Sequence, residues 1–398
     1  MATKIYKVEE ARRLARARLP RMMFDYIEGG SGDERLCSTN IAAFDRIELM
    51  PRVLTNVAKR DLSCQILGID AGLPFGIAPM GMCAISTPGA DQILAREAAL
   101  RRIPLGVSTA SSATLESVIK QSDGYAWFQL YADPAVEFVD ELVGRAEASG
   151  YTVLVLTVDV PIPSFRIRDL SNGFGFPMTW GPRQLFDLAC HPRWSLSTLA
   201  HSLSHGTPKP MNYATSSQGA SFVRGSSRAR ADWDFLHRLR DRWPHKLVVK
   251  GVQAPEDARR IKAAGADAIY VSNHGARQLN AAPPSIESVA PVRAAIGDDM
   301  PLIVDGGVRS GEHVIKAIAS GADFVMIGRS AMFGLGARGA EGLSDIIDSF
   351  AREASSVIGL VGKTRMDDID ATCLAEAHEH WPADYRTKGM KGGDETDG

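Results

Sequence analysis

The sequence has few cysteines, no long apolar run and no excess of positive charge, and each shortage excludes a class of protein. Its apolar runs fall short of the roughly 18 residues that a membrane-spanning helix needs, and residues 1–20 lack a signal-peptide core. A formal net charge of −2 gives no basic footprint for nucleic acid, which is not an expected partner. Neither a disulfide framework nor a metal site is expected, and a reducing cytoplasm fits, because the five cysteines are scattered: Cys37, Cys64, Cys83, Cys190 and Cys373.

Short apolar runs alternate with helix-patterned segments from residue 74 onward. Eight such runs are typical of a closed parallel (β/α)8 barrel, the TIM barrel, whose strands are buried on both faces. A doubly wound open sheet is the alternative, but residues 78–81 do not form its G-x-G-x-x-G phosphate turn. The expected strands are Pro74–Ala78, Pro104–Ser108, Ala126–Tyr131, Val153–Asp159, Leu247–Lys250, Ala268–Ser272, Leu302–Asp305 and Phe324–Gly328.

Residues 1–370 are expected to form a single α/β domain, whose first segment, 1–60, is helical. Val8–Ala15 is amphipathic, and a second helical run, Met22–Ile27, ends at consecutive glycines. Tyr26 lies just before this break. Its hydroxyl could point into a cavity, or its ring could simply pack against a helix end.

A histidine and an arginine follow the sixth expected strand. The loop after Val271 contains His274 and Arg277, three residues apart. A histidine titrates near neutral pH and can accept a proton, whereas an arginine can grip a carboxylate through two parallel hydrogen bonds. The pair therefore predicts a site for a small carboxylic acid at the carboxyl end of a barrel strand.

Polar residues end most of the buried strands, although packing alone does not require them. Individually they could cap a helix or bind a stray carbonyl. Because the carboxyl ends of barrel strands meet at one mouth, we expect them to surround a common site. They are Ser108, Gln129, Tyr131, Thr157, Asp159, Lys250, Ser272, His274 and Asp305.

Glycines and arginines follow the last two strands. Residues 305–311 read DGGVRSG, and Gly328 precedes Arg329. Backbone N–H groups can approach a phosphate at glycines, helix N-termini favour an anion, and Arg309 and Arg329 add positive charge. We expect a phosphate-binding site here, with a plain glycine turn as the alternative.

A long insertion separates the fourth and fifth strands. Its middle, residues 178–224, carries four basic residues against one acid, a local net charge of +3, mixed with tryptophans and leucines. This composition suits a membrane surface; a contact with a neighbouring subunit and a mobile lid are the alternatives. Deleting 178–224 is expected to leave a soluble, active enzyme. The tail, residues 385–398, is expected to be disordered.

Four motifs resemble the FMN-dependent L-2-hydroxy acid oxidase and dehydrogenase family, and the resemblance spans residues 5–362. Within the family the resemblance points to the membrane-associated (S)-mandelate and L-lactate dehydrogenases, and segments 165–170 and 191–196 are similar to those of the mandelate enzyme. The resemblance implies FMN as the cofactor, no metal, and a homotetramer. The four motifs are Tyr26–Gly30, Trp127–Tyr131, Ser272–Leu279 and Asp305–Arg309.

The resemblance also implies roles for residues that act on the substrate. His274 resembles the base that removes the α-proton, or the hydroxyl proton in a hydride-transfer mechanism. Asp159 resembles the carboxylate that orients and charges the imidazole. The residues implied to bind the substrate's carboxylate and hydroxyl are Arg277, Arg166, Tyr26 and Tyr131.

A second set of roles concerns the cofactor. Lys250 is implied to lie beside the flavin N1/O2 edge, where a fixed cation stabilises the reduced flavin. The isoalloxazine is implied to contact Pro79, Met80, Gly81, Ser108, Gln129, Thr157 and Ser272. The ribityl chain and phosphate are implied to contact Asp305, Gly306, Gly307, Arg309, Gly328 and Arg329.

Four positions discriminate within the family. Ala110 stands where the glycolate oxidase pattern has tryptophan, which implies room for an aryl side chain. Gly81 stands where the oxidases have alanine, which favours an acceptor other than oxygen. Ala276 and Asn280 depart from the glycine and aspartate of the family pattern, and these changes could shift the loop or the pairing of Arg277.

We therefore expect oxidation of (S)-mandelate, or a similar (S)-2-hydroxy acid, to the 2-keto acid, with electrons passed through FMN to a membrane quinone. An oxidase that releases hydrogen peroxide and an L-lactate dehydrogenase are the alternatives, and a non-catalytic barrel that binds a phosphorylated ligand is a more remote one. The expected location is the cytoplasm and, if the insertion binds lipid, the inner face of the cytoplasmic membrane.

Overall fold

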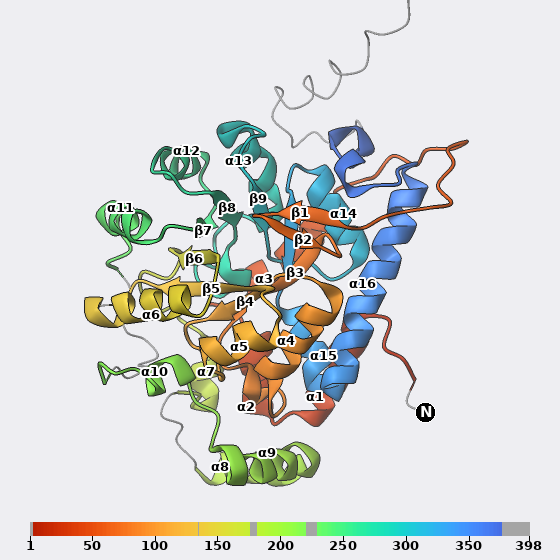
Figure 1. The fold of residues 1–398 in the computed structure, drawn as a ribbon. Coiled ribbons are helices and arrows are strands. Elements are labelled where there is room, and N and C mark those ends of the chain that lie inside the picture. The colour runs from red at the N-terminus through yellow and green to blue at the C-terminus, as the bar shows by residue number, and fades with distance from the viewer. Residues whose placement is uncertain (1–2, 134, 176–180, 220–228, 376–398) are drawn as a thin grey trace, which may run out of the picture.

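Eight parallel strands close into a barrel in the computed structural model, which describes residues 3–133, 135–175, 181–219 and 229–375 (Figure 1). The order around the barrel, β10-β3-β4-β5-β6-β7-β8-β9, confirms the predicted TIM barrel, and its strands agree with the eight expected runs to within two residues. They are β3 (Phe75–Met80), β4 (Leu105–Ser108), β5 (Ala126–Tyr131), β6 (Val153–Thr157), β7 (Lys246–Val252), β8 (Ala268–Val271), β9 (Leu302–Val304) and β10 (Phe324–Ile327).

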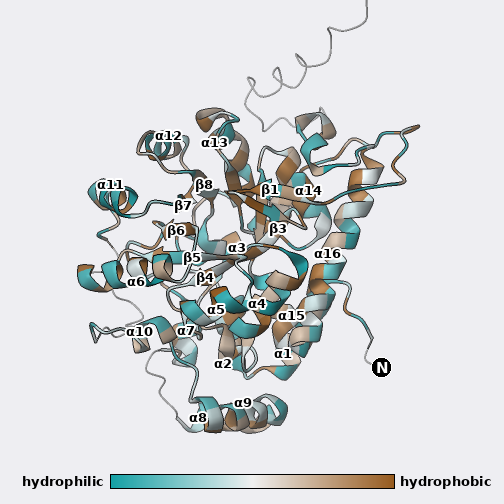
Figure 2. Ribbon diagram, in the orientation of Figure 1, coloured by the Kyte–Doolittle hydropathy of each residue, from teal (hydrophilic) through white to brown (hydrophobic). Residues whose placement is uncertain are grey.

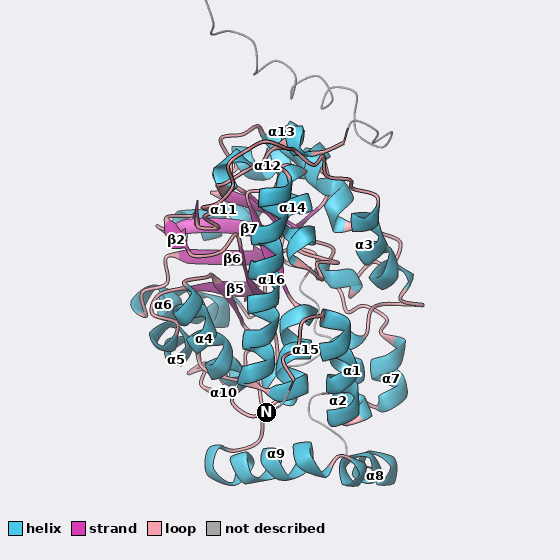
Figure 3. Ribbon diagram, turned by 90° about the vertical axis from the view of Figure 1, so that its right-hand side faces the viewer, coloured by secondary structure: helices cyan, strands magenta, loops and turns pink. Residues whose placement is uncertain are grey.

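Helices cover the outside of the barrel (Figure 3). In Figure 2 the exposed helices α11 and α12 are largely hydrophilic, whereas the strands are mostly hydrophobic. The helices that follow the strands are α4 (Ala90–Arg101), α5 (Leu115–Gln121), α6 (Val136–Ala148), α11 (Trp233–Arg242), α12 (Pro255–Ala263), α13 (Val289–Ile296), α14 (Gly311–Ala319) and α15 (Arg329–Arg338), and α16 (Ala340–Leu360) completes the layer.

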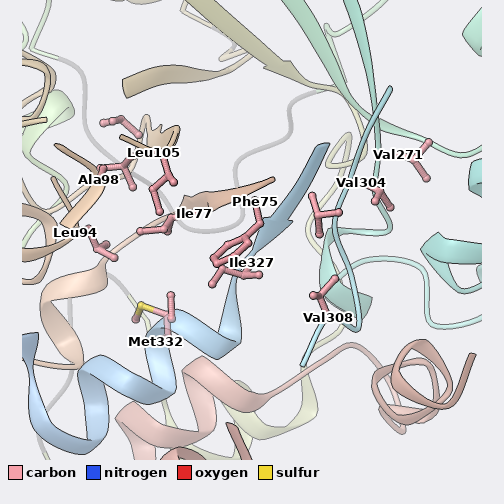
Figure 4. Close-up of a cluster of buried hydrophobic side chains, with 14 of the residues drawn as sticks. Phe75, Ile77, Leu94, Ala98, Leu105, Val271, Val304, Val308, Ile327 and Met332 are labelled. Atoms are coloured by element: carbon pink, nitrogen blue, oxygen red, sulfur yellow. The ribbon is translucent and has the colours of Figure 1, made fainter. Parts of the chain in front are cut away.

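Two buried layers stabilise the barrel. In the outer layer, strand residues such as Ile77 and Leu105 pack against Leu94 and Ala98 of α4 (Figure 4). Alternate strand residues point into the barrel, where Trp127 and others form a second cluster. Such residues fill the barrel, so the space for a ligand lies at its rim.

A short hairpin packs with the inner cluster. Strands β1 (Cys64–Ile66) and β2 (Ile69–Ala71) pair antiparallel, and Ile66 and Ala71 are buried with the residues inside the barrel. The sequence pattern did not predict this hairpin.

The N-terminal segment forms α1 (Val8–Arg18), α2 (Arg21–Glu28) and α3 (Arg35–Asp45). The prediction that helices continue to residue 60 is wrong, because residues 46–60 run along the C-terminal part of the chain. There Met50 N donates to Cys373 O at 2.8 Å and Arg52 N donates to Leu360 O at 3.0 Å.

The insertion is described over residues 181–219, and the predicted disordered tail lies outside the described residues. Figures 1 and 3 both show α8 and α9 together at one end of the molecule, beyond α1, α2 and α7. Within the described residues, no helix has the length and apolar character needed to cross a bilayer. The helices of this region are α7 (Ile167–Asn172), α8 (Pro182–Cys190), α9 (Pro192–His205) and α10 (Met211–Ala214).

Candidate active site

A cavity of about 210 Å³ lies where the carboxyl ends of the barrel strands meet, and most of the predicted site residues line it. Four others lie next to lining residues: Asp159, Gln129, Thr157 and Ser272. The predicted residues on the wall are Tyr26, Pro79, Met80, Gly81, Ser108, Ala110, Tyr131, Arg166, Lys250, His274, Arg277, Asp305, Gly306, Gly307, Arg309, Gly328 and Arg329.

His274 begins a short turn, η2 (His274–Ala276), directly after β8. All three residues have positive φ, of 56°, 61° and 64°. Hydrogen bonds stabilise the turn: Ala276 N donates to Asn273 Oδ1 at 3.2 Å, and the Asn273 amide exchanges two hydrogen bonds with Asn40 of α3. The N-terminal segment thus fixes the backbone that presents the histidine.

The imidazole of His274 pairs with Asp159, which follows β6. Its Nδ1 lies 3.0 Å from Asp159 Oδ1, and the two side chains are 19% and 12% exposed. A carboxylate only accepts hydrogen bonds, so Nδ1 carries the hydrogen and Nε2 keeps a lone pair. Nε2 can therefore accept a proton from a molecule in the cavity.

Burial sets the ionisation of this pair. It lowers the pKa of His274 below its ordinary value, and the Asp159 charge counteracts part of that effect. Burial alone raises the pKa of Asp159, but the charges of His274 and Lys250 outweigh it and hold the pKa below the usual range. At neutral pH the site therefore contains a neutral imidazole beside a carboxylate, the state required of a base.

A glycine allows Asp159 to come this close. Gly251 lies at the irregularity of β7, with φ 102°, and a Cβ there would lie 2.5 Å from the Asp159 side chain. Any larger residue would displace the carboxylate from His274.

Two arginines and a tyrosine lie around the histidine. Arg277 donates to the carbonyls of Tyr26 and Gly29 at 2.8 and 2.9 Å, and its guanidinium lies 5.0 Å from the Tyr26 ring centre. Arg166 donates to Arg277 O at 3.4 Å. Since both guanidinium groups line the cavity, they can together bind a carboxylate.

A buried lysine, Lys250, also lines the cavity, and its charge acts on Asp159. Lys250 Nζ donates to Ser272 Oγ at 2.7 Å and lies 3.3 Å from Asp305 Oδ2. Burial lowers the pKa of Lys250, but the charges of Asp305 and Asp159 more than offset this, and the pKa lies above its usual value. The cavity thus has a permanent cation in its wall.

Two further cations, Arg309 and Arg329, also line the cavity. Both are half-buried, and neither has a carboxylate ion-pair partner in the described part of the chain. Burial and repulsion from Arg329 lower the pKa of Arg309 to about 10. Gly307, with φ 86°, lies against Asn40 O so closely that a Cβ would meet it at 2.1 Å. Two neighbouring arginines that lack carboxylate partners, beside a glycine turn, fit a phosphate group.

Two buried polar side-chain atoms near the cavity lack hydrogen-bond partners. Gln129 Nε2 and Thr157 Oγ1 are buried without a hydrogen-bond partner among the described residues. Unpaired buried polar groups are costly and point to a missing ligand. A donor set of Gln129, Thr157 and Lys250, with a cationic phosphate end, fits a flavin mononucleotide laid along the cavity.

The comparisons with known proteins agree with this fit. The sequence profile of the FMN-dependent dehydrogenases matches residues 15–376. The chain belongs to the FMN-dependent dehydrogenase family. The predicted cofactor, FMN, is thereby confirmed, and so is the family of 2-hydroxy acid dehydrogenases and oxidases.

Relatives within this family include enzymes for aryl and for small acids. The chain is 37% identical to (S)-mandelate dehydrogenase of Pseudomonas putida over 367 residues, which is 91% of this chain and 92% of that protein. It is 34% identical to L-lactate dehydrogenase of Pseudomonas syringae pv. syringae over 377 residues, 94% of this chain and 99% of that one.

The similar solved structures include a mandelate dehydrogenase and a mandelate oxidase. A crystal structure of (S)-mandelate dehydrogenase, described as a monotopic membrane protein, has a TM-score of 0.87 and 36% identity, covering 94% of this chain and 100% of that one. A mandelate oxidase with (S)-4-hydroxymandelic acid has a TM-score of 0.79 and 32% identity, covering 93% and 98%.

The residues that depart from the family pattern have other contacts. Asn280 Oδ1 accepts from Leu36 N at 3.2 Å, and its amide donates to Asp33 Oδ1 at 2.5 Å, so it ties the histidine loop to the N-terminal segment. Within the described residues, no hydrogen bond joins the Asn280 side chain to Arg277. Ala276 is fully buried despite its positive φ of 64°.

Sequence analysis missed the residues that support the site. Asn40 lies far from the motifs in sequence, and nothing in its surroundings predicts its pairing with Asn273. The apolar wall was also missed: Met82, Val160, Met326 and Met332 line the cavity. Asn273 itself could have been predicted, because it lies inside the motif that contains His274.

Proposed function

We propose that the protein is an FMN-dependent dehydrogenase that oxidises (S)-mandelate, or an (S)-2-hydroxy acid of similar size, to the 2-keto acid. The observation that carries the proposal is the His274–Asp159 pair at 3.0 Å, which faces a cavity also lined by Arg277 and Arg166. A base and two carboxylate-binding cations are the groups that this reaction requires.

In this mechanism Arg277 and Arg166 bind the substrate carboxylate, and Tyr26 and Tyr131 orient its carboxylate and hydroxyl. His274 Nε2 then removes the α-proton, or the hydroxyl proton in a hydride transfer. Asp159 stabilises the imidazolium that results.

Bound FMN supplies the two-electron acceptor that side chains cannot provide. We assign its ring to the wall between Gly81 and Ser108, where Gln129 and Thr157 offer unpaired polar atoms. Lys250 would hold a positive charge near the flavin and would favour the negative charge that reduction adds to it. Arg309 and Arg329 would hold the phosphate.

The pocket wall supports a large substrate side chain. Ala110 is small and lines the cavity, and a Cβ placed on Gly81 would lie 3.2 Å from the Ala110 methyl. Larger residues at either position would occupy the space beside the substrate. The mandelate enzymes among the relatives are in keeping with an aryl group here.

A membrane quinone is the proposed electron acceptor. On α8 and α9 the side chains of Phe186, Leu196 and Leu203 are 72%, 65% and 82% exposed. Exposed apolar side chains on a basic segment suit the surface of an anionic membrane. Replacing Leu196 and Leu203 by serine is expected to abolish pelleting with anionic vesicles, and a wild-type protein that never pellets would contradict this part.

The test begins with an anaerobic absorbance spectrum before and after (S)-mandelate, with L-lactate and glycolate alongside. His274→Ala should bind FMN normally yet be reduced about 10²–10⁴-fold more slowly by mandelate. His237→Ala, on the exposed face of α11, serves as the control and should be reduced at the wild-type rate. An unchanged reduction rate in His274→Ala would remove the histidine from the mechanism.

An oxidase is the second candidate, because a mandelate oxidase is among the similar structures. Admitting air to the reduced protein separates the two. Slow reoxidation without peroxide supports the dehydrogenase, and rapid reoxidation with peroxide supports the oxidase. The proposed homotetramer is tested by light scattering of the purified protein.

A further inference from the structure

The insertion that carries the exposed apolar helices also contacts loops around the cavity. In the loop after β3, Ile85 O accepts a hydrogen bond from the buried indole Nε1 of Trp194, at 3.0 Å. In the loop after β5, the Tyr213 hydroxyl donates to Asp133 Oδ2 at 3.1 Å. The insertion is therefore attached to the catalytic end of the barrel.

Its firmest attachment is Asn212 of α10, which is completely buried. Asn212 Oδ1 accepts from Leu115 N at 2.9 Å, and its amide lies 3.3 Å from both Ser108 O and Thr109 O, to which it donates. An amide side chain can accept from an N–H through its oxygen and donate to two carbonyls through its NH₂ group. One side chain thus fixes both ends of the loop after β4.

The loops held by Trp194 and Asn212 form facing parts of the pocket wall. Gly81 lies on the first and Ala110 on the second, and Met82 N donates to Ala110 O at 2.9 Å between them. Gly81 and Ala110 are so close that a single added methyl would be in tight contact. A shift of either loop therefore changes the room left for a substrate side chain.

We propose that Asn212 and Trp194 are positioning residues of the substrate pocket. Through them the insertion fixes the two loops relative to each other, and so sets the size of the 2-hydroxy acid side chain that is accepted. This inference rests on the proposed function. It gives the insertion a task inside the enzyme that does not depend on a membrane.

The test compares substrates rather than total activity. In Asn212→Ala the ratio of kcat/KM for (S)-mandelate over L-lactate should change about tenfold, mostly through KM. Trp194→Phe keeps the ring but loses the hydrogen bond, and should change the ratio in the same direction. Binding of phenylacetate and propionate, which cannot be oxidised, should change in parallel when read from the flavin absorbance of the holoprotein.

Trp243→Phe is the matched control. Trp243 is fully buried and its Nε1 donates to Lys246 O at 3.0 Å, at the amino end of β7, far from the pocket loops. Its loss should lower the melting temperature and leave the ratio unchanged. Should Asn212→Ala not fold, Trp194→Phe carries the same test.

Two outcomes separate the inference from the function on which it rests. If both pocket variants melt earlier but keep the wild-type substrate ratio and analogue binding, Asn212 and Trp194 are merely structural and the inference is wrong. If no 2-hydroxy acid reduces the wild-type flavin, the proposed function fails, whatever the variants do.

Discussion

At the scale of single residues, the backbone around the base is strained. His274, Gly275 and Ala276 all have positive φ, and a left-handed conformation costs about 1–2 kcal/mol for each residue other than glycine. The turn persists because Asn273 holds Ala276 N and Arg329 donates to Gly275 O at 2.6 Å. The same arginine that is assigned to the phosphate therefore also supports the catalytic turn.

The ionisation of the base predicts a pH profile. Only neutral His274 accepts a proton, and burial holds its pKa below the ordinary 6.5, so kcat/KM should rise with pH and level off with a midpoint below 6.5. Asp159→Asn removes the charge that raises this pKa. The midpoint should move further down while the plateau falls about 10²–10⁴-fold. A midpoint that moved up would show that Asp159 does not act on the imidazole.

Pocket size gives a second prediction at this scale. Ala110→Trp places an indole beside Gly81, where even a methyl is tightly accommodated. The KM for (S)-mandelate should rise at least about tenfold, whereas glycolate, which has no side chain, should be little affected. Steady-state kinetics with both acids provides the measurement. Equal losses for both substrates would indicate a damaged flavin site instead of a narrowed pocket.

At the scale of elements, the insertion divides into two parts. No residue of α8 is buried, whereas Asn212 and Tyr213 of α10 are. Replacing residues 181–193 by a short linker should therefore weaken vesicle binding, because Phe186 is lost while Leu196 and Leu203 remain, and should leave a folded, yellow protein. Deleting all of 178–224 removes Asn212 and leaves Thr109 O and Leu115 N without the partner that Asn212 supplies, at about 1–3 kcal/mol each. Thermal melting of the two deletions tests this contrast.

That contrast revises the expectation from sequence that the whole of 178–224 is dispensable. The composition of the insertion is enough to predict a surface segment with basic and apolar residues, because these residue types can be read directly from the sequence. The anchoring by Asn212 is not visible, since its partners Ser108, Thr109 and Leu115 are about a hundred residues away. If the protein that lacks all of 178–224 proves as stable as the protein that lacks only 181–193, the expectation that the whole segment is dispensable is correct.

The barrel itself was predictable for a physical reason. Strands buried on both faces must be short apolar runs, and the polar residue that ends each run must lie at the mouth. Segments shaped by distant partners were not predictable in this way: the β1–β2 hairpin depends on the barrel interior, and residues 46–60 depend on the C-terminal segment.

At the scale of the whole molecule, the cations that bind the cofactor destabilise the protein when the cofactor is absent. In the apoprotein, desolvation and the neighbouring Arg329 lower the pKa of the half-buried Arg309 to about 10. Arg309→Met should stabilise the apoprotein by about 1 kcal/mol or more and weaken FMN binding about tenfold to a hundredfold. Urea unfolding of the apoprotein and flavin fluorescence titration measure the two effects. A variant with less stable apoprotein and unchanged FMN affinity would contradict the assignment of the phosphate end.

The packing of α1 on α15 joins the two ends of the domain. Arg18 donates to Gly336 O at 3.0 Å, and Gly336 approaches α1 so closely that a Cβ would lie 3.0 Å from the Ala15 methyl. During synthesis the first helix leaves the ribosome long before the helix that covers it. At roughly 5–20 residues per second, the apolar face of α1 waits on the order of tens of seconds for its partner. The growing chain therefore exposes this apolar face of α1 to solvent for most of its translation. The active site, which α2 and α3 help to build, cannot form until nearly the last element has been synthesised.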